Sequence, residues 1–290
     1  MDEHCSNPEW NAARGKKWRS QVARMEAMLS PVDEPLIRAL RLDAPCRIAE
    51  VGCGGGGTSL ELLRRAPAGS VVHGFDISPA LIEVARGRGT APHVLAFDIA
   101  DMGTAVPPAG AYDRLVSRFG VMLFTDPPEA FRNLLRWLAS AGRFAFAVWG
   151  HPMENPWMTI VRETVAGIVD LASMDPDAPG AFRYGDVSRL LRLLDEAGYR
   201  DLEASDWRGM LPIGGELPVE EAAEFALAAF SNFAELLFEA GDRALRDSRE
   251  ALAQRLSPYQ RDGAVRMEAR VHIVTGATSS REAVRLADGD

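Results

Sequence analysis

A glycine-rich stretch at residues 50–57, Glu-Val-Gly-Cys-Gly-Gly-Gly-Gly, has the clearest chemical meaning in this chain. A short apolar run precedes it and a segment of helical composition follows it. Glycine permits positive φ and lets a ligand touch the backbone, and the first turn of a helix offers unpaired N–H groups. The pattern predicts a nucleotide-type binding turn between a strand and a helix, although a tight structural turn has a similar composition.

The glycine spacing leaves two classes of cofactor open. Gly52, Gly54 and Gly57 satisfy the dinucleotide pattern G-x-G-x-x-G. With Gly56 as the third glycine, the same stretch reads G-x-G-x-G. The carboxylate of Glu50, just before the loop, would repel a pyrophosphate and attract a cation. S-adenosylmethionine carries a sulfonium and an ammonium, so Glu50 favours it over a dinucleotide.

Two aspartates end the second and third predicted strands. Asp76 is placed to accept hydrogen bonds from the ribose hydroxyls of either cofactor. Asp98 would accept from an adenine amino group while the backbone of Ile99 reaches the ring edge, which favours S-adenosylmethionine. Each aspartate also fits a solvated loop residue or a helix cap.

Four stretches together resemble the class I S-adenosylmethionine-dependent methyltransferases: E-V-G-C-G-G-G, G-F-D-I-S, A-F-D-I-A and Y-D-R-L-V-S-R-F-G-V-M-L-F. The resemblance covers residues 8–150. Within the family, this stretch is similar to the small-molecule branch, which includes quinone and natural-product methyltransferases. It implies that the first turn wraps the methionine part of the cofactor. The cofactor contacts that it implies are Gly52, Cys53, Gly54, Asp76, Ile77, Asp98 and Ile99.

The resemblance also implies roles for residues outside the glycine loop. Ser117, near the end of the fourth strand, matches the position whose backbone carbonyl meets the cofactor's ammonium. Trp10 and Trp18 resemble an N-terminal leader whose aromatic residues fold over the cofactor, although Trp18 equally fits the first apolar anchor of a helix. Arg118 departs from plain apolar versions of the motif.

Methyl transfer from a sulfonium is a direct displacement, which needs a base only where the acceptor must lose a proton. His151 follows the predicted fifth strand at the ligand-binding edge of the sheet and is the candidate base, although it also fits an exposed loop residue. The leading prediction is methylation of an O, N or C atom of a small, apolar metabolite. Two alternatives are an NAD(P)-dependent oxidoreductase and a methyltransferase-fold protein that uses the cofactor for a non-methylating reaction.

The elements that must position these residues alternate between strands and helices. Apolar runs predict strands at 46–51, 71–76, 93–98, 112–119 and 142–149. The expected fold is α/β, a Rossmann-like doubly wound and mostly parallel seven-stranded sheet with an N-terminal helical lid and cap insertions. Its parts are a lid at 1–45, a cofactor-binding core at 46–150, a cap at 151–185 and a C-terminal part at 186–290.

The C-terminal part contains a helical insert at about 218–258 and an alternating strand from Val265 to Ile273, which is expected at the sheet edge. Aromatic residues in the cap and the insert could form the wall of an apolar pocket, and they also fit core packing or a homodimer interface. These residues are Trp157, Phe182, Tyr184, Phe225, Phe230, Phe233 and Phe238.

The composition excludes several other classes of protein. The chain has 290 residues and a net charge of −9, which is the wrong sign for binding nucleic acid. Three scattered cysteines predict neither a disulfide framework nor a metal site. The N-terminal residues do not read as a secretion signal, and no apolar run is long enough to insert into a membrane. A cytoplasmic enzyme with a small-molecule substrate is expected.

Overall fold

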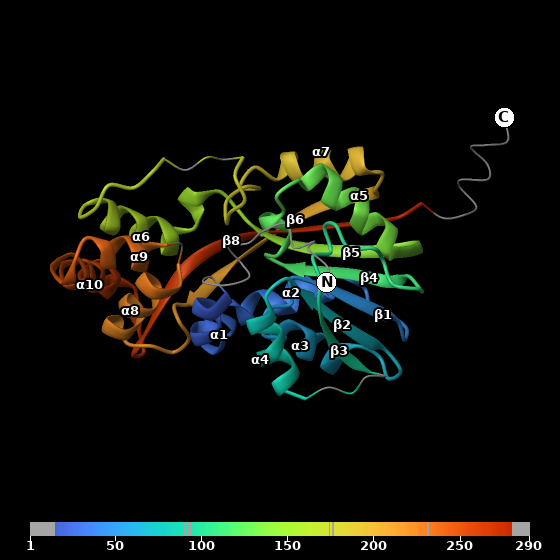
Figure 1. Ribbon diagram of the computed structural model, residues 1–290, viewed down its shortest axis with the longest axis horizontal. Coiled ribbons are helices and arrows are strands. Elements are labelled where there is room, and N and C mark those ends of the chain that lie inside the picture. Colours follow the sequence, from blue (N-terminus) through green and yellow to red (C-terminus); the bar gives the residue numbers. More distant parts are fainter. Residues whose placement is uncertain are drawn as a thin grey trace.

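A mostly parallel sheet of seven strands forms the centre of the molecule (Figure 1). The computed structural model describes residues 15–89, 91, 94–173, 175, 177–230 and 232–279, with side chains from residue 19 onward. The strand order is β3-β2-β1-β4-β5-β8-β6. The strands are β1 (Arg47–Val51), β2 (Val71–Asp76), β3 (Leu95–Ile99), β4 (Tyr112–Arg118), β5 (Leu138–Trp149), β6 (Arg200–Pro212) and β8 (Ala264–Ala277), and a short β7 (Gln260–Arg261) pairs with β8.

Helices cover both faces of the parallel part of the sheet, which confirms the doubly wound fold. Figure 1 shows α2 (Asp33–Ala39), α3 (Gly57–Arg65) and α4 (Pro79–Gly87) on one face. The other face carries α5 (Pro127–Trp137) and α7 (Val187–Ala197). Residues of β1 are buried almost throughout, as expected for a strand covered on both sides.

The two helices of the second face begin where the sequence indicates. The side chain of Asp126 accepts a hydrogen bond from the backbone N–H of Glu129 at the start of α5. Asp186 caps α7 in the same manner, through the N–H of Ser188. Gly198 ends α7 with a φ of +102°, which a residue with a side chain rarely adopts.

The direction of the crossovers reverses between β1 and β4. The connections from β1 to β2 and from β2 to β3 run toward one edge, and the connection from β4 to β5 runs toward the other. The connections that leave the carboxyl ends of the neighbouring strands β1 and β4 therefore run in opposite directions, and such a switch point is where open α/β sheets bind ligands.

Helices outside the sheet gather at two places. The first, α1 (Gly15–Leu29), contacts α4 and lies across the carboxyl ends of the strands. The second group is a bundle of α6 (Pro156–Ala166), α8 (Val219–Ala229), α9 (Phe233–Glu239) and α10 (Asp242–Leu256) beside the long strands β6 and β8 (Figure 1). The last three form the predicted helical insert. Among the described residues, no helix combines the length and apolar character needed to span a bilayer.

The position expected for the last strand is wrong. β8 is antiparallel, as predicted, but it lies between β5 and β6, so β6 forms the edge of the sheet. The alternation of polar residues in β8 indicated one solvated face. His272, however, is 2% exposed, and Asp206 of the neighbouring strand β6 satisfies its ring nitrogen Nδ1 at a distance of 2.7 Å. The alternation of the sequence therefore places His272 on the solvent side, but its pairing with Asp206 lets this polar side chain occupy a buried position.

Candidate functional site

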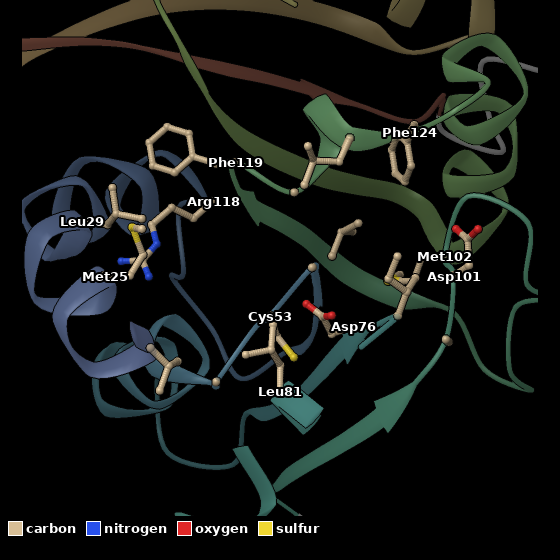
Figure 2. Close-up of a pocket in the computed structure, with 18 of the residues that line it drawn as sticks. Met25, Leu29, Cys53, Asp76, Leu81, Asp101, Met102, Arg118, Phe119 and Phe124 are labelled. Carbon is tan, nitrogen blue, oxygen red and sulfur yellow. The ribbon is translucent and has the colours of Figure 1, made fainter. Parts of the chain in front are cut away.

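A cavity opens at the carboxyl ends of the parallel strands, next to the switch point between β1 and β4. Figure 2 shows Met25, Leu29 and Arg118 at one end, Asp101 and Met102 at the other, and Asp76 between them. The walls come from α1, the glycine loop and the turns that follow β2, β3 and β4. Further lining residues are Val22, Glu26, Val51, Gly52, Cys53, Gly55, Ile77, Leu81, Ala100, Phe119, Gly120, Leu123, Phe124 and Thr125.

The glycine loop has the backbone conformation that its composition predicts. Gly52 and Gly54 have φ values of +70° and +54°. A Cβ on Gly52 would lie 3.1 Å from the Cα of Gly120, so the turns after β1 and β4 approach each other closely. A Cβ on Gly54 would meet only open space. Among the residues predicted to contact the cofactor, Gly52 and Cys53 line the cavity, and Gly54 follows them directly.

Asp76 joins the end of β2 to the glycine loop. One carboxylate oxygen accepts the backbone N–H of Gly54 at 2.9 Å, and the other accepts that of Ser78 at 2.9 Å. Burial raises the pKa of Asp76, and these two hydrogen bonds oppose the rise. Both Asp76 and Ile77 line the cavity, and their contact with a cofactor stays a prediction. Each carboxylate oxygen keeps a lone pair with which it can accept a ligand hydroxyl.

The N-terminus of α3 is occupied by a carboxylate from the chain itself. Glu26 of α1 accepts a hydrogen bond from the backbone N–H of Gly57, the first residue of α3, at 3.2 Å. Its other oxygen accepts from Arg88 at 2.7 Å. Packing is close here, since a Cβ on Gly55 would lie 2.5 Å from Val22 of α1. The sequence gives no signal for this role of Glu26, because an acidic residue in an amphipathic helix is ordinarily part of its solvent face.

Glu50 does not line the cavity, contrary to the role expected for it. Its side chain is 1% exposed and accepts a hydrogen bond from the hydroxyl of Ser59 in α3. Burial raises the pKa of Glu50 to about 8, and the Ser59 hydrogen bond and the charge of Arg118 oppose this only in part. A carboxyl group that is protonated at neutral pH provides no charge to select a cation, so Glu50 does not have the electrostatic role that its place in the sequence indicates.

Ser117 is fully buried and connects β1 to the turn after β4. Its hydroxyl donates to the backbone carbonyl of Val51 at 2.8 Å and accepts the N–H of Gly120 at 3.2 Å. The Ser117 side chain therefore shapes the cavity floor from behind without lining it. The role expected for Ser117 concerns its backbone carbonyl and stays a prediction. For Trp18 the backbone lies in α1, but its side chain is outside the described residues, as is the whole of Trp10.

Asp98, the aspartate expected to contact the cofactor at the end of β3, faces away from the cavity, and Asp101 lines the cavity instead. Asp98 is paired with Arg86 at 2.9 Å and with the ring of His73 at 2.8 Å, and neither Asp98 nor Ile99 lines the cavity. The reason is strand alternation, which buries Phe97 and turns Asp98 outward. Asp101 and Met102, just beyond the strand, line the cavity instead. The second aspartate of A-F-D-I-A-D-M was the signal available in the sequence.

Arg118, the residue that departed from the family pattern, lines the same cavity. One guanidinium nitrogen, Nη1, lies 3.0 Å from both carboxylate oxygens of Asp33 in α2. Thr58 of α3 donates its hydroxyl to the same carboxylate at 3.0 Å. Burial raises the pKa of Asp33, while Arg118 and Thr58 oppose the rise. The ion pair ties the end of β4 to α2 directly behind the cavity.

His151 lies away from the cavity, so the structure does not support its expected role as a base. Its side chain is exposed, and its Nδ1 accepts the backbone N–H of Met153 at 3.3 Å in the turn that follows β5. The fully buried Asn155 fixes this turn by donating to the carbonyls of Gly150 and Arg270. His151 is thus the exposed cap of a short helical turn.

Most of the cap and insert aromatics belong to the core. Phe119, which lines the cavity, stacks on Trp149 with ring centroids 4.1 Å apart. Trp149 contacts Trp157 of α6, and Trp157 contacts Phe230 at 5.0 Å. Phe238, by contrast, is 79% exposed. None of the aromatic residues expected to form the pocket wall lines the cavity, whose aromatic lining residues are Phe119 and Phe124. The cluster of Trp149, Trp157 and Phe230 supports Phe119 from behind.

The comparisons with known proteins identify relatives over most of the chain. A family model described as a methyltransferase domain matches residues 49–146. The trans-aconitate 2-methyltransferase of Methylobacterium radiotolerans is 30% identical over 199 residues, which cover 68% of each chain. The demethylmenaquinone methyltransferase of Thermus thermophilus is 30% identical over 143 residues, 49% of this chain and 64% of that relative, so the match spans slightly under two thirds of its length.

A solved structure supports the fold. The YcgJ protein of Bacillus subtilis aligns with a TM-score of 0.56 at 14% sequence identity, over 87% of this chain and 99% of that one. The likeness therefore extends beyond the central strands to most of the molecule.

Proposed function

Because this chain belongs to the class I S-adenosylmethionine-dependent methyltransferases, we propose that it transfers the methyl group of S-adenosylmethionine to a small, largely apolar metabolite. The acceptor is an O, N or C atom, attacked by direct displacement at the methyl carbon. Natural-product chemistry, a cytoplasmic location and a homodimer remain predictions from the sequence.

The observation that carries this choice of cofactor is the carboxylate of Glu26 at the N-terminus of α3. In dinucleotide-binding folds the pyrophosphate occupies that position, where it accepts the free N–H groups of the helix. Here the N–H of Gly57 already donates to Glu26, and a phosphate would meet a like charge. S-adenosylmethionine has no phosphate, so this geometry favours it and disfavours the NAD(P)-dependent oxidoreductase.

The remaining cavity residues fit the parts of this cofactor in order. Asp76 would accept the ribose hydroxyls, and Ile77 would lie against the ribose and adenine face. Asp101 and Met102 line the end of the cavity that would hold the adenine, in place of Asp98 and Ile99, which the sequence predicts there. Gly52 and Cys53 line the cavity and would lie along the methionine part, and Gly54 follows them in the loop. Figure 2 shows Cys53 on the α1 side of Asp76.

Apolar side chains surround the space left for the acceptor. Phe119 and Leu123 follow β4, and Met25 and Leu29 come from α1. Figure 2 shows Phe119 on the same side of the cavity as Met25 and Leu29. When S-adenosylmethionine is bound, its sulfonium supplies an electrophilic methyl group. The protein holds the acceptor atom in line with this methyl group and excludes water. With His151 outside the cavity, positioning is the whole of the mechanism that we propose.

Cofactor binding is tested by thermal unfolding with one ligand at a time. S-adenosylhomocysteine at a hundred times its Kd should raise Tm by roughly 5 °C, since binding then adds about 2.7 kcal/mol to the native state. NAD⁺ and NADP⁺ at the same concentration should leave Tm unchanged. A rise with either dinucleotide and none with S-adenosylhomocysteine would overturn the proposal.

Methyl transfer is tested separately, by following S-adenosylhomocysteine formation over a panel of hydroxylated, amine and carbon-acid acceptors of apolar character. If S-adenosylhomocysteine forms only when an acceptor is present, the result supports methyl transfer. Consumption of an acceptor without S-adenosylhomocysteine formation would instead support the non-methylating alternative.

A further inference from the structure

Arg118 brings a buried positive charge to one end of the cavity. Its side chain is 9% exposed and lines the cavity at the end formed by Met25 and Leu29 of α1 (Figure 2). An arginine is always ionised and is costly to bury without anionic partners. Asp33 of α2 supplies one such partner, so the question is what the rest of the guanidinium contacts.

Asp33 satisfies only one part of this guanidinium. Both hydrogen bonds to Asp33 start from Nη1, at 3.0 Å. Within the part of the chain that the structure describes, Nε and Nη2 of Arg118 have no hydrogen-bond partner. These two nitrogens form the side edge of the guanidinium, whose parallel N–H groups match the two oxygens of a carboxylate.

We propose that this free edge of Arg118 binds the α-carboxylate of S-adenosylmethionine, an inference that rests on the proposed function. The ribose position at Asp76 and the adenine end at Asp101 leave the amino-acid end of the cofactor at the Arg118 end of the cavity (Figure 2). Asp33 then acts as a positioning residue, because it holds Nη1 and turns the opposite edge toward the ligand.

The charges around this end suit a zwitterion. Glu26 lines the same part of the cavity, and its negative charge is shared with Arg88 and the N–H of Gly57. A carboxylate ligand would pair with Arg118, while an ammonium beside it would lie in the field of Glu26. A ligand with a carboxylate alone would meet Glu26 without compensation.

The test compares two ligands by isothermal titration calorimetry. S-adenosylhomocysteine carries the α-carboxylate, and its decarboxylated analogue, a 3-aminopropyl thioether of adenosine, keeps the adenosine, sulfur and amine. In Arg118→Gln the affinity for S-adenosylhomocysteine should fall roughly 10- to 150-fold, the range for losing charge-assisted hydrogen bonds. The affinity for the analogue should change less than threefold, and Arg118→Lys should restore part of the loss.

Removing Arg118 leaves the Asp33 carboxylate buried without its cation, which endangers folding. The double variant Asp33→Asn with Arg118→Gln removes both charges and should show the same selective loss. An unchanged affinity for S-adenosylhomocysteine, or an equal loss for both ligands in folded variants, would overturn the inference. If the wild-type protein binds neither ligand, the proposed function itself fails. This outcome is distinct from an unchanged affinity or an equal loss in the variants, which overturn only the role of Arg118.

Discussion

The carboxylate of Asp76 accepts the backbone N–H of Gly54 at 2.9 Å, so the end of β2 holds the glycine loop in place. A second hydrogen bond, from Ser78, fixes the other carboxylate oxygen at the start of α4. The residue expected to recognise the ribose thus also shapes the loop that receives the rest of the cofactor.

Asp76→Ala should therefore weaken cofactor binding by about 1.5–3 kcal/mol, through the loss of hydrogen bonds to a charged group. Titration of S-adenosylhomocysteine into the folded variant measures the effect. Asp98→Ala is the matched control, because Asp98 also lies near the end of a neighbouring strand but contacts Arg86 and His73 outside the cavity. Equal affinities in both variants would remove Asp76 from the ribose site.

Gly54→Val should reduce the affinity for S-adenosylhomocysteine by at least about tenfold, since a β-branched side chain resists positive φ and would project into open space beside the cavity. Gly89→Val is the control. Gly89 also has a positive φ and open surroundings, but it lies beyond α4, away from the cavity. If the two variants bind equally well, strain at the loop is irrelevant to binding.

His151→Ala should change the rate of methyl transfer less than threefold at saturating acceptor and cofactor. Its imidazole accepts a backbone hydrogen bond from Met153 and is exposed, away from the cavity. The decisive measurement is the rate of S-adenosylhomocysteine formation between pH 6 and 9. A loss of about 100-fold or more in the variant, with a wild-type rate that rises with pH over this range, would restore His151 as a general base.

Glu50 should make the fold less stable as the pH rises. Because its pKa is raised from 4.5 to about 8, the native state keeps the proton that the unfolded chain loses. The free energy of unfolding should consequently fall by on the order of 3 kcal/mol between pH 5 and pH 8. Chemical denaturation across this range measures the fall.

Glu50→Gln should remove most of that decrease, and at pH 8 it should be more stable than the wild type. Glu61→Gln serves as the control, since Arg64 and Arg65 lower the pKa of Glu61 to about 2 and its titration ends below this pH range. A wild-type stability that stays flat from pH 5 to 8 would contradict the protonated state of Glu50.

The sequence predicts the elements whose signals are local. The strand before the glycine loop, the cap of α5 at Asp126 and the end of α7 at Gly198 each depend on residues within one or two turns. The place of β8 depends instead on pairing with the distant strands β5 and β6, where His272 meets Asp206, 66 residues away. Nothing near His272 in the sequence indicates that its partner makes it a core residue.

Site residues divide in the same way. Gly52 and Asp76 are predictable because the turn between strand and helix fixes where they lie. Asp98 lies within β3, where strand alternation turns it outward, and Asp101 lies in the turn beyond the strand, so choosing between them requires knowing where the strand ends. Glu26 and Arg118 depend on how α1 and α2 pack over the sheet, which no short pattern determines.

The insertion of β8 between β5 and β6 also constrains the order in which the chain folds during its synthesis. β6 pairs only with β8 among the described strands, and β8 follows it by more than 50 residues. The ribosome therefore releases β6 long before its partner exists, and the edge of β5 stays open over the same interval. Unpaired edges recruit other chains, so the nascent protein should depend on chaperones until β8 emerges and closes the sheet in one step.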